Sequence, residues 1–218
     1  MLRKAIKAAC TMSRYQKACI IALCFSAAAV LIRLDHGSLK RKSFGLADSK
    51  EQTTSSDFEK YHKKTFTVVK VVDGDTIDID IRDANNNCTR IRLWGVDTPE
   101  TKSPDNIPRY FGPEAAKFTA ESALGEKVTL YLEEHSTRDK YGRLLAYIQL
   151  PTGSFLNEVL VSEGFAYADL RFRHSLYQKY KQLQSSARRQ QRGLWAEVTH
   201  EQLPEWLKGV SQNFLQTE

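Results

Sequence analysis

The chain has 218 residues and a formal net charge of +6, a length that allows one ordinary domain with additional segments. The positive charge lies at one end. Residues 1–43 carry nine Lys/Arg and one acidic residue, whereas residues 44–218 carry 23 basic and 25 acidic residues. The basic composition therefore does not indicate a body that binds nucleic acid over its whole surface. Only one cysteine, Cys88, lies in the body, which excludes a disulfide within it, so cysteine usage does not settle the compartment.

The N-terminal part contains an apolar run. Residues 18–32 are fifteen residues without a charge, and only basic charges precede them. A signal peptide cut after Ala29 and a mitochondrial presequence both have this basic start, and an uncleaved span would be short against the usual ~17–25 residues. We predict that residues 1–34 form a single-pass membrane anchor or an export signal, with a mitochondrial address as the alternative. Residues 35–62 are polar and are expected to be a linker.

Strand patterns begin near residue 65. Residues 66–72 are rich in β-branched side chains, and in residues 75–81 three isoleucines alternate with Asp78 and Asp80, which is typical of a strand. The turn-forming residues 83–87 predict a hairpin with a third strand over 89–96. Alternation also places Asp75 on the apolar face, where a carboxylate is costly to bury unless a metal or a cation accompanies it.

The remaining elements complete a small mixed fold. Pro113 is expected to begin a helix that ends near Leu124, and residues 128–132 and 144–148 are expected to be strands. Two further helices are expected over 154–164, with Ser154 as the cap, and over 174–192. Five strands with about three helices predict a mainly β, α+β domain over residues 63–197, a five-stranded OB-like barrel. Residues 198–218 are expected to be a C-terminal tail with an amphipathic turn near 203–210.

Three short motifs carry the chemistry: Asp73-Gly74-Asp75-Thr76, Asp97-Thr98-Pro99-Glu100 and Asp139-Lys140-Tyr141-Gly142-Arg143. Carboxylate oxygens suit a hard divalent cation such as calcium, and an arginine fork suits a phosphodiester. An isolated Asp-Gly motif is usually only a turn, but several such clusters together predict metal-assisted phosphodiester hydrolysis.

These motifs resemble those of the staphylococcal nuclease (thermonuclease) family over about residues 65–195. Further matching segments are Gly112-Pro113-Glu114-Ala115, Asn157-Glu158, Gly164-x-Ala166 and Leu194-Trp195. The resemblance implies an OB-type barrel and a calcium-dependent endonuclease that cleaves DNA and/or RNA to products with 3′-phosphate ends. A monomer with a nucleic acid substrate is expected. The alternative is a catalytically silent OB-fold module that binds nucleic acid or protein, but such modules are expected to lose the carboxylates or arginines that this chain keeps.

The resemblance also implies roles for individual carboxylates. Asp75 and Asp97 would be the direct calcium ligands, the main-chain carbonyl of Thr98 would be a further ligand, and Asp73 would support them. Glu100 would serve as the general base or would orient the attacking water.

The resemblance assigns the phosphate to Arg92 and Arg143, which would neutralise the charge that develops on its oxygens. Strand alternation makes Arg92 the less secure of the two, because it places this side chain opposite its apolar neighbours. Lys140, Tyr141 and Phe172 are candidate nucleotide contacts. Phe172 departs from the tyrosines of the family's type member because it has no hydroxyl, although its ring could stack on a base.

Overall fold

The computed structural model describes residues 54–102 and 107–209. A helix over residues 54–61 comes first. The strands that follow are β1 (Thr65–Asp73), β2 (Thr76–Ile79), β3 (Thr89–Leu93), β4 (Val96–Asp97), β5 (Lys127–Tyr131), β6 (Leu144–Gln149) and β7 (Tyr167–Ala168). The α-helices are α3 (Gly112–Ala123), α4 (Leu156–Ser162), α5 (Tyr177–Arg189) and α6 (Glu205–Lys208), and two short 3₁₀ helices are η1 (Gly193–Ala196) and η2 (His200–Gln202).

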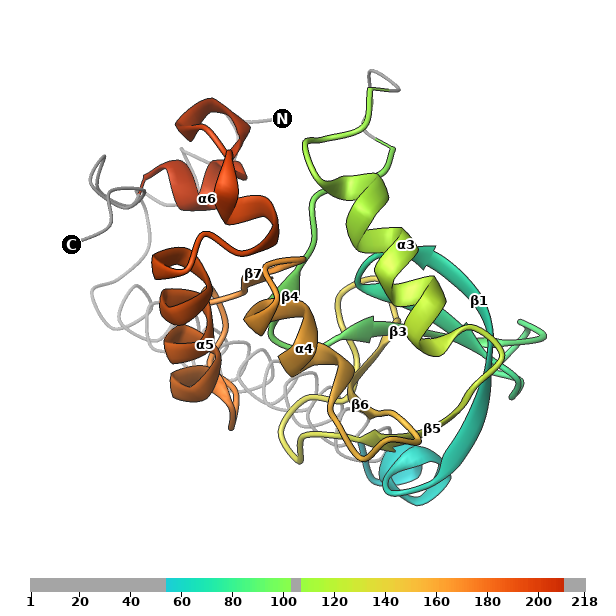
Figure 1. The fold of residues 1–218 in the computed structure, drawn as a ribbon. Coiled ribbons are helices and arrows are strands. Elements are labelled where there is room, and N and C mark those ends of the chain that lie inside the picture. Colours follow the sequence, from blue (N-terminus) through green and yellow to red (C-terminus); the bar gives the residue numbers. More distant parts are fainter. Residues whose placement is uncertain (1–53, 103–106, 210–218) are drawn as a thin grey trace, which may run out of the picture. The chain divides into compact units, whose positions relative to one another are not determined.

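Five strands close into a barrel in the order β1-β2-β3-β6-β5, and β4 pairs with β7 in a separate two-stranded sheet (Figure 1). The pairs β1–β2, β2–β3, β5–β6 and β1–β5 are antiparallel, whereas β3 and β6 are parallel. This arrangement confirms the five-stranded OB-type barrel, including the predicted hairpin of the second and third strands. Helix α3 packs on β1, α4 packs on β6, and α5 packs on α4.

The barrel interior follows the period of two along the strands. Ile77 of β2 lies opposite Ile91 of β3, which lies opposite Leu144 of β6. All three side chains are fully buried. The isoleucine pattern in the sequence therefore identified one apolar row of the core correctly.

Asp78 is an exception to the expected alternation of buried and exposed residues. Its neighbours Ile77 and Ile79 face the core, so solvent exposure was expected, yet Asp78 is buried. Arg90 lies opposite it across the β2–β3 pair and donates to both carboxylate oxygens, at 2.8 and 2.9 Å. A bidentate arginine thus compensates the burial of this carboxylate.

Asn157 of α4 joins that helix to the barrel. Its side chain is fully buried. Its Oδ1 accepts the main-chain N–H of Ile148 at 2.9 Å, and its Nδ2 donates to the carbonyls of Trp94 at 3.0 Å and Ala146 at 3.3 Å. One amide therefore satisfies main-chain groups of two barrel segments.

Asn157→Ala is expected to lower the free energy of unfolding by about 2–4 kcal/mol, because buried main-chain groups lose their partners. Urea unfolding of the two proteins measures the difference. Asn87→Ala, in the exposed hairpin turn, is the matched control and should change stability by less than about 0.5 kcal/mol. Equal stability of the Asn157 and Asn87 variants would contradict this role.

The polar linker predicted over residues 35–62 does not extend to its predicted end. Residues 54–61 are helical, and Tyr61 is fully buried with its hydroxyl 3.1 Å from that of Thr89. The carboxylate of Asp57 accepts hydrogen bonds from Arg138 at 2.7 Å and from Thr137 at 2.8 Å. The linker prediction is wrong for this last part, because one aromatic side chain and one buried ion pair stabilise the helix against the barrel.

The C-terminal tail predicted over residues 198–218 is also folded in its described part. Helices η2 and α6 lie there, and Leu203 and Leu207 are buried against Tyr167, Leu194 and Trp195. The described part of the expected amphipathic turn thus contains helix α6, whose Leu207 is buried. Residues 210–218 lie outside the described residues.

Two helices are shorter than predicted. Helix α4 begins at Leu156 without a side-chain cap from Ser154, and α5 begins at Tyr177 rather than at residue 174. His174 instead lies 3.0 Å from the Tyr147 hydroxyl through its Nδ1, so a tertiary contact replaces the first helical turn.

No helix within residues 54–102 and 107–209 has the length and apolar character to cross a membrane. The anchor or export segment predicted over residues 1–34 lies outside the described residues, and it stays a prediction.

Candidate active site

A cavity of about 870 Å³ lies on the outer face of β2, β3 and β6. Thr76, Arg92 and Leu145 lie opposite one another across these strands, and all three line the cavity. They alternate with the buried row of Ile77 and its neighbours, so their side chains leave the barrel on its other face. The strand register thus determines which side chains reach the cavity.

The turn between β1 and β2 brings two predicted motifs together. Gly74 passes so close to Thr98 that a Cβ at this position would lie 2.8 Å from the Thr98 hydroxyl oxygen. The Thr119 hydroxyl of α3 donates to the Gly74 carbonyl at 2.6 Å, and the Thr98 N–H donates to Asp75 Oδ2 at 2.9 Å. A glycine is needed here for the close approach, and that approach places Asp75 beside the segment that contains Asp97.

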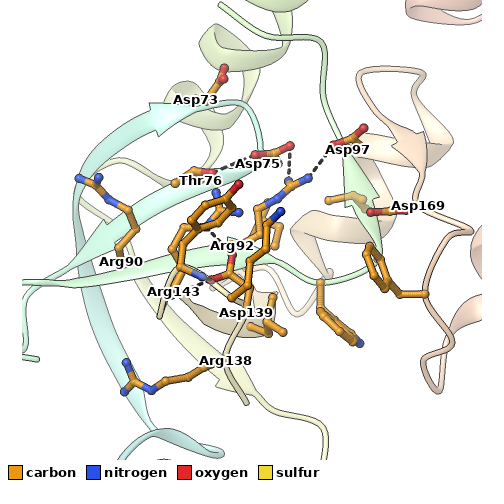
Figure 2. A pocket seen from close by; sticks show the side chains of 18 of the residues that line it. Asp73, Asp75, Thr76, Arg90, Arg92, Asp97, Arg138, Asp139, Arg143 and Asp169 are labelled. Atoms are coloured by element: carbon orange, nitrogen blue, oxygen red, sulfur yellow. Dashed lines mark hydrogen bonds and ion pairs between the residues drawn. The ribbon is translucent and has the colours of Figure 1, made fainter. Parts of the chain in front are cut away.

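Arg92 lies between the two predicted ligand carboxylates. Figure 2 shows its guanidinium between Asp75 and Asp97, with an ion pair to Asp75 and another of 2.7 Å to Asp97. Strand alternation had counted against Arg92 and had placed Asp75 on the core face. Asp75 is indeed buried, and Arg92 is the cationic partner that its burial requires. Arg92 does lie opposite its apolar neighbours, but the outer face of β3 lines the cavity, so this position does not count against it.

The charges of this group are strongly coupled. Burial alone would lower the pKa of Arg92, but the charges of Asp75 and Asp97 outweigh it and raise that pKa. Burial and the neighbouring charge of Asp75 raise the pKa of Asp97 above its usual range, although Arg92 opposes them. Arg92 therefore stays charged and balances two carboxylates that repel each other.

Glu100 lies at the rim of the same cavity. Partial burial, then a hydrogen bond with Asp73 and the charges of Asp73, Asp75 and Asp97, raise the pKa of Glu100 to about 7. A carboxylate with this pKa is well matched to accept a proton at neutral pH. Asp73 itself accepts the Gly74 N–H at 2.9 Å and forms the hydrogen bond with Glu100, which fits a supporting position.

Arg143 reaches the cavity from the turn before β6. Its Nε donates to Asp139 Oδ2 at 2.6 Å, and Asp139 Oδ1 accepts the N–H groups of Tyr141 at 2.9 Å and Arg143 at 3.0 Å. The Asp-Lys-Tyr-Gly-Arg motif is therefore a tight turn organised around one carboxylate. The remaining N–H groups of the guanidinium are left for an anionic ligand.

Comparisons with known proteins agree with this geometry. The family described as staphylococcal nuclease homologue matches residues 90–197. The thermonuclease of Staphylococcus hyicus is 35% identical over 156 residues, which cover 71% of this chain and 82% of that protein. This chain belongs to the staphylococcal nuclease family. The thermonuclease of Staphylococcus intermedius is 37% identical over 133 residues, which cover 61% of this chain and 76% of that protein. Endonuclease YncB of Bacillus subtilis (strain 168) is 37% identical over 118 residues, which cover 53% of this chain and 54% of that protein.

The structure brings together almost all the site residues that the family resemblance implied. Those lining the cavity are Asp73, Asp75, Arg92, Asp97, Glu100, Lys140, Tyr141, Arg143 and Phe172. Thr98 is buried, and its main-chain N–H donates to the carboxylate of Asp75. Tyr141 and Phe172 are exposed by 73% and 57%, so both rings are accessible to a ligand, and the Lys140 ammonium lies 4.9 Å from the Tyr141 ring.

Sequence reasoning missed three residues beside Asp97. Arg171 lies 3.5 Å from Asp97 and pairs with Asp169 at 2.8 Å, and both line the cavity. Trp206 Nε1 donates to Asp97 Oδ2 at 2.8 Å. Arg171 follows β7, in a stretch where the resemblance to the family is loose. Trp206 lies beyond residue 197, where the family match ends. No sequence motif therefore indicated either residue.

The donor set of this family member fits a calcium ion. Among the described residues, six acidic and six basic side chains line the cavity, so a divalent cation would give it the net positive charge that a phosphodiester requires. The carboxylates of Asp75 and Asp97, the two predicted ligands, both pair with the Arg92 guanidinium, so their oxygens are held close together at one point of the cavity. Hard oxygen donors of this kind are what calcium prefers.

No group of three or more His, Cys, Asp or Glu side chains in the described part of the chain is arranged to hold a metal. The ligand set implied by the family has two carboxylates and one main-chain oxygen, so it does not require such a group. Arg92 pairs with both carboxylates and offsets one of their two negative charges, and a bound cation would share them with this arginine.

Proposed function

We propose that the chain is a calcium-dependent nuclease that hydrolyses phosphodiester bonds of DNA and/or RNA and leaves 3′-phosphate ends. The observation that carries the proposal is that Asp75, Arg92, Asp97, Glu100 and Arg143, from separate segments, all line one cavity. The names of the relatives, thermonuclease and endonuclease, support a nuclease.

In the proposed reaction Asp75, Asp97 and the Thr98 carbonyl would hold the cation. Bound calcium would stabilise negative charge on the phosphate oxygens. Glu100, which lines the same cavity, takes a proton from water or orients it as its oxygen attacks phosphorus. The bond from phosphorus to the 5′-oxygen breaks, and that oxygen leaves with a proton from the surrounding water.

The two arginines would act on the phosphate. Arg143 has guanidinium donors that Asp139 does not use, and these can bind the oxygens on which charge develops. Arg92 keeps its charge beside the carboxylates and so adds a second fixed positive group. Retention of this set disfavours the silent binding module, which would need none of these five residues.

Cleavage is expected to require calcium. The full-length chain is incubated with single-stranded DNA and with RNA, in calcium and in chelator, and the product ends are identified. Calcium-dependent products with 3′-phosphates are expected. Asp97→Asn should lose the calcium response, whereas the matched control Asp80→Asn, at an exposed position, should keep it. A folded chain that binds nucleic acid without cutting it in calcium would favour the silent module instead.

A further inference from the structure

The segment after the family match contributes a side chain to the cavity. The match ends at residue 197, and α6 follows at Glu205–Lys208. Leu203 and Leu207 on either side of Trp206 are buried in a small apolar cluster with Tyr167 and Trp195. The segment that carries Trp206 is therefore attached to the body by its own packing.

Trp206 holds one end of the Asp97 carboxylate. Its Nε1 donates to Asp97 Oδ2 at 2.8 Å, while Arg92 donates to Oδ1 at 2.7 Å. The Arg171 guanidinium lies 4.7 Å from the centre of the Trp206 ring, and the Tyr167 ring meets it edge-on at 6.5 Å. The indole is thus held by a hydrogen bond through its N–H group and by contacts of its ring with Arg171 and Tyr167.

This arrangement restricts Asp97 without using up its capacity to bind a cation. A carboxylate has about four lone-pair sites, two on each oxygen. Oδ1 accepts one hydrogen bond from Arg92, and Oδ2 accepts one from Trp206 with the Arg171 guanidinium 3.5 Å away, so a lone pair of Oδ1 stays open to a cation. The indole N–H can only donate, so Trp206 orients the carboxylate but cannot itself ligate a metal. Hydrogen-bond partners that orient ligating carboxylates typically contribute 10–100-fold to metal affinity.

We propose that Trp206 is a positioning residue for calcium binding, which acts by holding the carboxylate of Asp97 through its indole N–H. The proposal rests on the proposed function, because it takes Asp97 to be a calcium ligand. By this proposal helix α6 supports the calcium site through Trp206. If Trp206 has this role, the affinity for calcium depends on its indole N–H group even when no substrate is present.

Trp206→Phe tests this directly, because phenylalanine keeps an aromatic ring against Arg171 and Tyr167 and removes the N–H donor together with part of the ring. Calcium binding to the full-length chain is measured by titration calorimetry, without substrate, and the unfolding temperature is measured in chelator. The dissociation constant for calcium should rise about 10–100-fold. The unfolding temperature in chelator should fall by no more than about 8 °C, the shift expected from loss of one hydrogen bond to a charged group, so the chain stays folded in the assay. The value of kcat at saturating calcium should change by less than about threefold.

Lys208→Met is the matched control, since it removes a surface ion pair of the same helix and leaves the indole in place. Its calcium affinity should equal that of the unaltered chain. Unchanged calcium affinity in Trp206→Phe would overturn the proposal, and so would an equal loss of affinity in both variants. If the unaltered chain neither binds calcium nor cleaves nucleic acid, the proposed function itself fails. If it does both and Trp206→Phe is identical to it, only the role of Trp206 fails.

Discussion

Arg143→Ala is expected to lower the rate of phosphodiester cleavage by a factor on the order of 10²–10⁴. The guanidinium lies in the cavity and keeps donors that Asp139 does not use. These donors would bind the phosphate oxygens most strongly in the transition state, when their negative charge is greatest. Initial rates at saturating calcium, with a single-stranded DNA substrate, measure the loss.

The fold should survive this change. Asp139 still accepts the main-chain N–H groups of Tyr141 and residue 143, so the turn keeps its shape when the side chain is removed. Arg143→Lys should recover only part of the rate, because an ammonium lacks the planar fork of a guanidinium. Arg189→Ala, in the last turn of α5, is the control for loss of one positive charge. A rate within about threefold of normal in Arg143→Ala would refute the assignment.

Glu100→Gln should be comparably damaging, with a rate lower by about 10²–10⁴-fold. The substitution preserves size and hydrogen bonding but leaves no group that can accept a proton from water. The raised pKa of Glu100, about 7, reflects its partial burial and its position beside three other carboxylates. The same rate assay measures the effect, and calcium titration shows whether binding of the cation is retained.

Glu121→Gln is the matched control for Glu100. Glu121 lies on α3, pairs with Lys117 at 3.7 Å and is 66% exposed, so its replacement should leave the rate unchanged. A loss of calcium affinity in Glu100→Gln that is large enough to explain the fall in rate would make Glu100 a ligand instead of a base. Near-normal turnover of the purified variant would remove it from the reaction altogether.

Strand alternation was reliable inside the barrel and unreliable at its edges. Ile77 and Ile91 are in the core as predicted, because consecutive strand residues must face opposite sides. The same rule gave Asp75 a buried position that needs a cationic partner, and Asp75 is buried beside Arg92, although it belongs to the turn before β2. The rule undervalued Arg92, because it assumes that the outer face of a strand meets solvent, and in this barrel that face is one wall of the cavity.

Motif spacing predicted which residues gather at the cavity better than how they pair there. The Asp73–Thr76, Asp97–Glu100 and Asp139–Arg143 motifs do meet in one cavity, as the family resemblance implied. The pairing of Arg92 with both carboxylates depends on strand register and on the close approach of Gly74 to Thr98. Neither is visible in the order of residues, since each depends on segments brought together from different parts of the chain.

The sequence by itself determined the five barrel strands, the type of barrel and the residue types that the proposed reaction needs, because these depend on local periodicity and on short motifs. It did not predict the separate pair of β4 and β7. The tertiary structure alone decided that residues 54–61 join the folded body, that Arg171 borders the site, and that Trp206 contacts Asp97 from 109 positions away in the chain. Such contacts depend on packing between segments that are distant in the chain. A hydrogen bond between two side chains of such segments produces no periodic pattern in the sequence, so sequence reasoning cannot find it.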